Sequence, residues 1–571
     1  MHFFQTKTMK NDDEGEETFL DRAEGAGLAD KAEKEAGKTE EESEEREVAR
    51  KTWHLALLTL VSRVLGLFRE MTKAWFLGTG WLSDAFSSAF VLPNFVRRLF
   101  AEGAISTGFI PGFKRCLAEK ATKNAGQFAS SSLTLLGIVG LAATLLGYVF
   151  APALAGLFGT DRAETTLLLR IMFPFLTTTA VAALFQGVLN TLGNFWPSAL
   201  ASILFNLIAI AIPWAFPGWL DNPARRMAVG VLIGGVAQIL CQLPSLRKTG
   251  LDIRLVSPRR AFGDKGAVEA FKAMLPTILG MAAYHLNDII GTIFAARVGT
   301  GTASSLQYSL RLQEFILGIF AVSAGTVLLP TLVDRARRAS WPAFSSLFGR
   351  ALRDILFVSI PTAAFSILVS EQLVSLLFQG GSFTGQSARL TSSIFVWHQA
   401  GLVFIAADKI LLPVFLALGD TKTPALAGLA SFLVNLLLAA VLHGRFGGQG
   451  IAFSLSFAAF VNMVALLFRL RAAPVPGLHS ELSASFHWAL RLLGYSLVAA
   501  VPVWFLKTPL LALFSSNSSR LLSLGLPLVI LGTVFAGVGV GLIVAVKDPE
   551  GETVAATYKA KFKRKMASGE H

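Results

Sequence analysis

The chain has 571 residues, of which 53% are hydrophobic and only 16% are charged, and its mean hydropathy is +0.56. Soluble domains carry about 25% charged residues, so this composition excludes an ordinary soluble protein and indicates a polytopic helical membrane protein. The net charge of +13 is explained by basic loops between membrane spans better than by nucleic-acid binding.

Residues 1–50 form an acidic extension with 8 basic and 16 acidic side chains, whereas the rest of the chain has 43 and 22. The extension lacks the charged, apolar and cleavage sections of a signal peptide. Its composition predicts a disordered or loosely helical cytoplasmic tail. A solvated extension explains it, and a regulatory role stays open.

The next part of the chain, 51–247, contains six apolar stretches that predict a first bundle of membrane-spanning helices. These spans cover about 53–78, 83–113, 127–157, 164–190, 197–216 and 226–246.

The first two spans are unusual because they are apolar and yet rich in charge. A charged side chain that faces lipid at mid-bilayer costs roughly 2.5–3.5 kcal/mol, so these groups must face one another or a water-filled hollow. Because basic groups outnumber acidic ones, we expect the hollow to attract an anion, and the planar fork of arginine suits phosphate. The charged residues are Arg63, Arg69, Glu70, Lys73, Asp84, Arg97, Arg98 and Glu102.

Helical spacing supports convergence on one hollow. At 100° per residue, Arg63, Glu70 and Lys73 fall on one broad face of the first span. Asp84, Arg98 and Glu102 share a face of the second span.

A basic connector at 248–265 separates the first bundle from a second one at 266–471. Two additional spans are predicted within 472–548, near 484–506 and 521–546, and a basic tail follows at 549–571. The six spans of the second bundle cover about 267–298, 303–332, 346–369, 386–416, 424–443 and 450–470.

Charged residues also occur inside the second bundle. Arg311 and Glu314 lie one helical turn apart, which is consistent with a local ion pair or with an arginine that reaches the same hollow as Arg63. The group His285, Asn287 and Asp288 fits a buried structural network or an ion site. We expect a structural or interfacial role for Asp408 and Lys409.

The loops predict the orientation of the chain. Loops after even-numbered spans are basic, as in KRCLAEKATK and DRARR, whereas loops after odd-numbered spans are short and mostly polar or Gly-rich. An excess of Lys and Arg marks cytoplasmic loops. Fourteen spans with both termini in the cytoplasm fit this alternation.

An internal repeat suggests two similar bundles. LNTLGNFWPSALASILFNL from Leu189 and FLALGDTKTPALAGLASFLVNL from Phe415 both contain Leu-Gly, a polar turn, Pro, an apolar run and Asn-Leu. The predicted fold is therefore an all-α polytopic membrane protein of about 14 transmembrane helices, with two pseudo-symmetric six-helix bundles plus two C-terminal helices. In this plan a substrate site lies between the bundles near mid-membrane.

Motifs for other kinds of chemistry are missing. No zinc, nucleotide-binding or hydrolase motif occurs in a supportive context, and the two cysteines, Cys116 and Cys241, lack metal-like spacing. The sequence therefore predicts a transporter that is not an enzyme and has no metal or cofactor.

Several ordered motifs resemble the MurJ/MviN family of lipid II flippases. They are SRVLGLFRE, SDAFSSAFVLPNFVRRLFAEGAISTGFIP, QGVLNTLGNFWPSA, QYSLRLQEFILGIFAVSAGTVLLP, LFQGGSFT and GDTKTP. The resemblance runs from about Trp53 to Arg471, and the number of spans extends it to Lys547.

This resemblance implies a fold of the multidrug/oligosaccharidyl-lipid/polysaccharide exporter type. It implies movement of lipid II, undecaprenyl-diphosphate-MurNAc-pentapeptide-GlcNAc, across the bacterial inner membrane during peptidoglycan synthesis, and so a role in cell-wall biogenesis and cell shape. Membrane lipids are implied as partners, and proteins of cell-wall synthesis and division are further candidates. The implied substrate-binding residues are Arg63, Arg69, Glu70, Asp84, Arg97, Arg98, Glu102, Asn190, Arg311 and Glu314.

Four other functions make their own demands on the sequence. A drug–cation antiporter of the same fold would favour an acidic, aromatic-lined cavity. A flippase for another polyprenyl-diphosphate glycan has the same physical requirements and stays open. A membrane glycosyltransferase would need a carboxylate–metal site on a sizeable external loop, and a structural scaffold would leave the intramembrane arginines unexplained.

Overall fold

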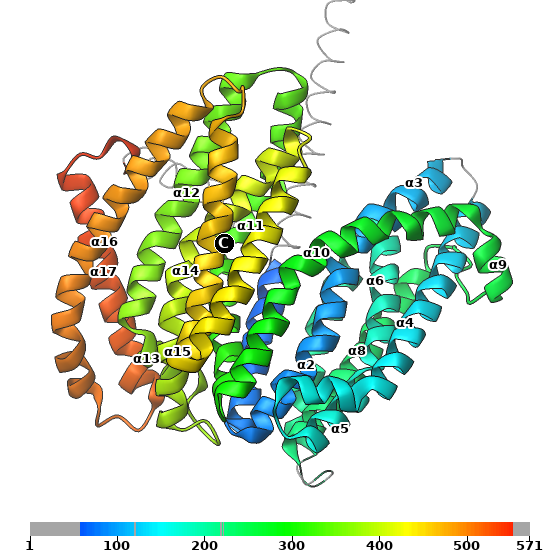
Figure 1. The fold of residues 1–571 in the computed structure, drawn as a ribbon, viewed down its shortest axis with the longest axis horizontal. Coiled ribbons are helices and arrows are strands. Elements are labelled where there is room, and N and C mark those ends of the chain that lie inside the picture. The colour runs from blue at the N-terminus through cyan, green and yellow to red at the C-terminus, as the bar shows by residue number, and fades with distance from the viewer. Residues whose placement is uncertain (1–56, 119–121, 217, 219, 221, 552–571) are drawn as a thin grey trace, which may run out of the picture. The chain divides into compact units, whose positions relative to one another are not determined.

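The computed structural model describes residues 57–118, 122–216, 218, 220 and 222–551 (Figure 1). Side chains are described in these ranges except at 100–104, 122–123, 279–284 and 319–327. The predicted extension 1–50 and nearly all of the predicted tail 549–571 lie outside the described residues.

Helices make up the described chain, in which the only β-pairing is an isolated bridge between Gly380 and Phe383. After helical residues 57–77, the first half contains α2 (Trp81–Leu99), η1 (Phe100–Phe109), α3 (Ile110–Ala118), α4 (Thr122–Phe158), α5 (Arg162–Met172), α6 (Phe175–Thr191), α7 (Trp196–Ala215), α8 (Pro223–Arg247) and the short α9 (Pro258–Gly263). The second half contains α10 (Lys265–Val298), α11 (Thr302–Arg337), α12 (Trp341–Leu368), α13 (Ser370–Phe378), α14 (Gly385–Ala417), α15 (Lys422–Arg471), α16 (Leu478–Phe514), η2 (Leu521–Gly525) and α17 (Leu526–Ala545).

Nine helices found in the described residues are long and apolar enough to cross a membrane. This confirms the predicted multi-pass helical architecture, while the number of fourteen spans stays a prediction. One of the nine, α15, combines the predicted eleventh and twelfth spans, but its backbone is non-helical at Gly447 (φ 55°, ψ −139°). Glycine tolerates this left-handed φ without a steric penalty, so α15 is two helical segments that meet at a kink.

Helices from Leu60 onward pack into one unit. Within the first half, α7 packs on α8, α4 on α6 and α2 on α5, and within the second half α11 and α15 both pack on α14. The long α10 contacts α2 and η1 on one side of the sequence and α11 and α15 on the other. The division into bundles at 51–247 and 266–471 stays a prediction, with α10 as the helix that touches both sets.

The last two long helices, α16 and α17, lie side by side (Figure 1). They are attached to α12 by Arg353, whose guanidinium lies 2.7 Å from Glu481 and 2.9 Å from Glu550. Deeper in the same contact, the fully buried Trp488 stacks on Phe357 at a centroid distance of 6.3 Å. The ion pairs of Arg353 and the stacking of Trp488 on Phe357 thus hold α16 and α17 against the second half of the chain.

A π-helix, η1, continues directly from α2. The backbone N–H of Ile110 donates to the carbonyl of Ile105, five residues back, where an α-helix would use four. Such segments are rare and are found frequently at functional sites. Arg97 and Arg98 occupy the last turn of α2, immediately before this change of helical geometry.

Candidate functional site

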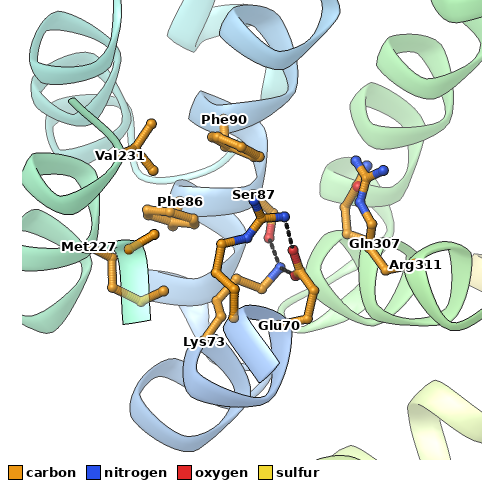
Figure 2. A pocket seen from close by; sticks show the side chains of 11 residues that line it. Glu70, Lys73, Phe86, Ser87, Phe90, Met227, Val231, Gln307 and Arg311 are labelled. Carbon is orange, nitrogen blue, oxygen red and sulfur yellow. Dashed lines mark hydrogen bonds and ion pairs between the residues drawn. The ribbon is translucent and has the colours of Figure 1, made fainter. Parts of the chain in front are cut away.

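A narrow pocket lies between the helical residues 60–77, α2, α7, α8 and α11. Its volume is about 20 Å³, which is room for one water molecule. Figure 2 shows Glu70 and Lys73 at its centre, with Gln307 and Arg311 on a neighbouring helix. The lining residues are Arg69, Glu70, Lys73, Phe86, Ser87, Phe90, Ala209, Met227, Val231, Gln307 and Arg311.

On the first helix, one carboxylate is shared by two cations. Glu70 Oε1 lies 2.9 Å from Arg69 Nη2, and Glu70 Oε2 lies 3.3 Å from Lys73 Nζ. Arg69 Nη1 also donates to Asn206 Oδ1 at 3.2 Å, and Lys73 Nζ lies 4.1 Å from the centroid of the Tyr308 ring. Glu70 and Lys73 are each only 6% exposed, so this group presents a fixed excess of positive charge to the pocket.

A second carboxylate joins two arginines from different helices. Glu314 Oε1 lies 2.9 Å from Arg98 Nη2 of α2, and Glu314 Oε2 lies 2.6 Å from Arg311 Nη1 of α11. Arg311 Nη2 is also 3.9 Å from Asp288 Oδ2 of α10. The side chain of Glu314 is 39% exposed, whereas both arginine side chains are 14% exposed. The predicted local ion pair of Arg311 and Glu314 is therefore part of a larger, accessible network that includes Arg98.

Arg63 is an exposed arginine on the first helix, and among the described residues it has no ion-pair partner. Its guanidinium lies against the backbone of Gly318 on α11, so closely that a Cβ atom added there would collide with it. The Arg63 guanidinium can lie this close to α11 because residue 318 is a glycine and has no side chain.

Two further predicted residues are positioned by other contacts, and a third has a side chain that is not described. Arg97 Nε donates to Asn94 Oδ1 at 3.1 Å, within α2. Asn190, near the end of α6, accepts a hydrogen bond of 2.7 Å from Ser198 Oγ on α7. Glu102 belongs to η1, but its side chain lies outside the described residues.

Asp84 is placed at the end of a helix and does not line the pocket. Its Oδ2 accepts from the backbone N–H of Gly301 at 2.6 Å, and its Oδ1 accepts from Ser304 N and Ser304 Oγ, both at 2.8 Å. The carboxylate, 3% exposed, thus satisfies the N-terminus of α11. Close by in sequence, Thr79 Oγ1 lies 2.7 Å from Ser387 Oγ on α14. We call these contacts of Thr79 and Asp84 with Gly301, Ser304 and Ser387 the clasp.

Asn206 was not predicted, although the internal repeat holds a signal for it. Its amide bonds Arg69 and donates to the carbonyl of Ser62 at 3.2 Å. The repeat pairs Asn206 with Asn435, which donates to Asn287 Oδ1 at 2.8 Å. The same position in each half of the chain therefore links to the first helix of its own half.

Lys73 and Asp288 also belong to the site, although neither is among the predicted substrate-binding residues. The sequence predicts Lys73 on the face toward the hollow, and Asp288 in a buried structural network or an ion site. His285 Nδ1 lies 3.4 Å from Arg98 Nη1, and Gln307 Nε2 lies 3.4 Å from Asp288 Oδ1. Within the described residues, His, Cys, Asp and Glu form no group of three or more that could hold a metal ion. These α10 residues therefore extend the charged network.

Residues 73–525 match the family described as "Lipid II flippase MurJ". The chain belongs to this family. It is 38% identical over 500 residues to the probable lipid II flippase MurJ of Treponema pallidum, which covers 86% of the chain and 95% of that protein. It is 33% identical over 429 residues to the probable lipid II flippase MurJ of Vibrio cholerae, with coverages of 73% and 81%. The predicted resemblance to the MurJ family is confirmed.

Solved structures show the same fold. One is titled "Lipid II flippase MurJ, inward closed conformation" and aligns with a TM-score of 0.71 at 24% identity, over 86% of this chain and 99% of that one. An inward-facing multidrug resistance MATE transporter of the MOP superfamily aligns with a TM-score of 0.59 at 16% identity, over 75% and 98%. The predicted all-α membrane fold is therefore confirmed. MurJ family members are named flippases, which are transporters and not enzymes.

Proposed function

We propose that this chain moves lipid II from the inner to the outer leaflet of the bacterial cytoplasmic membrane, and that arginines hold its diphosphate. The observation that carries the proposal is the convergence of Arg69 and Lys73 with Arg311, from helices in different halves of a MurJ-family chain, on one pocket. Undecaprenyl-diphosphate-MurNAc-pentapeptide-GlcNAc is the substrate that the family name indicates.

The charge of the network suits a diphosphate. Among the described side chains of the network, four basic groups pair with three acidic ones, so these residues keep an excess of positive charge for a ligand with a negative charge on each phosphate. Arginine forks bind phosphate oxygens through two parallel hydrogen bonds. The basic residues are Arg69, Lys73, Arg98 and Arg311, and the acidic ones are Glu70, Asp288 and Glu314. Arg63, beside Gly318, adds a positive charge that has no ion-pair partner among the described residues.

A pocket of about 20 Å³ cannot hold a disaccharide-peptide, so transport requires helices 57–77 and α2 to move away from α11. The clasp holds these elements together at one end of the site through the carboxylate of Asp84. Alternating access follows when the clasp and the opposite end open in turn. Lipid II binding favours one state only through the extra contacts that it makes there.

In the proposed topology both termini are cytoplasmic, and the clasp lies toward the outer face. The halves at 51–247 and 266–471 act as the two moving bundles, and the helices within 472–548 provide an apolar surface for the polyprenyl tail. Proteins of cell-wall synthesis and division are the proposed protein partners.

The arginine-rich network disfavours a drug–cation antiporter, since a cation would meet the excess positive charge at the binding site. A flippase for another polyprenyl-diphosphate glycan would use the same arginines. Native mass spectrometry of the purified protein with lipid II and competing polyprenyl diphosphates tests which glycan lipid is the substrate. We expect lipid II to displace the competitors, and preferential retention of another glycan lipid would reassign the substrate.

Gly318→Ala tests whether the placement of Arg63 matters. The new methyl group displaces the Arg63 guanidinium, the far end of a flexible side chain, so we expect weaker lipid II binding with unchanged thermal stability. The measurement is lipid II retention in native mass spectra beside a melting curve. Gly494→Ala on α16, where an added Cβ meets no atom within 4 Å, is the matched control. Equal lipid II retention in both variants would remove Arg63 from the proposed site.

A further inference from the structure

A carboxyl group that the transport site does not use lies between α14 and the second segment of α15. Asp408 Oδ2 accepts a hydrogen bond of 2.8 Å from Asn462 Nδ2. The other oxygen of each side chain, Asp408 Oδ1 and Asn462 Oδ1, is shielded from solvent and has no hydrogen-bond partner. Two acceptors are thus left without a donor at the same contact.

The surroundings of this pair are apolar. Ala407 and Ile410 on either side of Asp408 belong to a hydrophobic cluster that also includes Leu466 of α15. One turn before Asp408, the ring of Phe404 packs on Phe460 at 5.2 Å. An ionised carboxylate with one hydrogen bond is costly in such a place.

Few charges face Asp408. Lys409 follows it in sequence, is exposed, and is the charged group whose field reaches the carboxyl. α11, α12, α13 and α15 pack against α14, and among their described residues the partner of Asp408 is the neutral Asn462, with no ion pair formed. The nearest charge therefore does not replace the missing hydrogen bonds.

A proton on the Asp408 carboxyl group supplies the donor that these two acceptor oxygens lack. An ionised carboxylate and an amide can share one N–H···O bond, because the remaining oxygen of each group only accepts. A carboxylic acid and an amide can make two, since the acid O–H donates to the amide oxygen while the amide N–H donates to the acid carbonyl. The atoms without partners are those that this second bond would join.

We propose that Asp408 and Asn462 form a proton-binding site, in which Asp408 is neutral in this conformation and its proton bridges to the Asn462 amide oxygen. Asp408 lies nine residues before the end of α14, about 13 Å along the helix, at the end that the proposed topology places in the cytoplasm. Binding takes a proton from water and releases it there when α14 and α15 separate. The proton-binding site does not depend on the proposed function. Its use in coupling transport to a proton gradient rests on that function.

A metal ion fits this place less well than a proton. Hard cations in proteins take about six oxygen ligands, and only two acceptors without a partner meet at this contact. Sodium is therefore an alternative that the experiment has to exclude.

The test is infrared difference spectroscopy of the full-length protein in lipid nanodiscs across a pH series around neutrality. We expect the carbonyl stretch of a protonated carboxyl at neutral pH in the parent protein and its loss in Asp408→Asn, which keeps the shape and can pair with Asn462. Asp334→Asn, an exposed carboxylate on α11, is the matched control and should retain the band.

Asn462→Leu provides a second readout in a protein that keeps Asp408. The band should shift to higher frequency there, because the acid loses its hydrogen-bond partner. Identical carboxyl regions in parent and Asp408→Asn spectra would overturn the site, as would loss of the band when potassium is exchanged for sodium. Neither result affects lipid II binding by the arginines, so failure of this proposal is distinguishable from failure of the proposed function.

Discussion

Arg311→Ala is expected to abolish rescue of a bacterial strain depleted of its own lipid II flippase, with the variant still present in the membrane. Arg311 contacts two carboxylates and lines the pocket. Its removal takes away a proposed bidentate phosphate ligand. It also removes positive charge that balances the carboxylates of Glu314 and Asp288. Loss of a charge-assisted contact of this kind costs about 3 kcal/mol, which lowers lipid II affinity roughly a hundredfold.

Two variants separate this effect from general damage. Arg311→Lys keeps the charge but not the planar fork, so we expect partial rescue. Arg338→Ala removes an exposed arginine just after the same helix, paired with Asp334 at the surface, and should rescue fully. Normal growth of the Arg311→Ala strain would contradict the proposed role of this residue.

Asp84→Ala is expected to destabilise the closed clasp and to inactivate the protein by a different route. The carboxylate accepts three hydrogen bonds from Gly301 and Ser304, and loss of such a helix cap costs about 2 kcal/mol. A change of that size shifts a closed-to-open ratio by roughly 30-fold. The substitution leaves in place the arginines that we propose as lipid II ligands.

The measurement is disulfide formation between cysteines at Thr79 and Ser387, whose hydroxyl oxygens are 2.7 Å apart, after serine has replaced Cys116 and Cys241. Crosslinking should be efficient with Asp84 present and several-fold slower in Asp84→Ala. Asp84→Asn, which can accept but also presents an N–H₂ group to the backbone donors, should be intermediate. Equal crosslinking in all three would show that Asp84 does not hold the clasp.

Much of the helical architecture followed from hydropathy, because a bilayer leaves an apolar segment little choice other than a helix. Finer features did not follow. The π-helix after Arg98 has no sequence signature, since its bonding pattern depends on how η1 packs against α10 and α6. The separate spans predicted at 424–443 and 450–470 imply a loop between them, whereas the structure continues the helix on both sides of a single left-handed glycine, Gly447.

The charged site was predictable to a similar degree. Charges inside apolar stretches have to meet one another, and Arg69, Glu70, Arg98, Arg311 and Glu314 do so. Pairing partners were not predictable: a carboxylate in the sequence does not reveal whether it faces a guanidinium or, like Asp84, the N-terminus of another helix. Whether these residues bind substrate stays a prediction.

Glu314, held between Arg98 and Arg311, has a consequence for how cargo leaves. In the proposed mechanism, an arriving phosphate would take over guanidinium groups that are already paired with Glu314, and the Glu314 carboxylate would stay close by on the same helix as Arg311. Unloading then becomes an exchange of one anion for another. A carboxylate that competes for the same arginines would limit the affinity for the substrate and allow its release on the outer side.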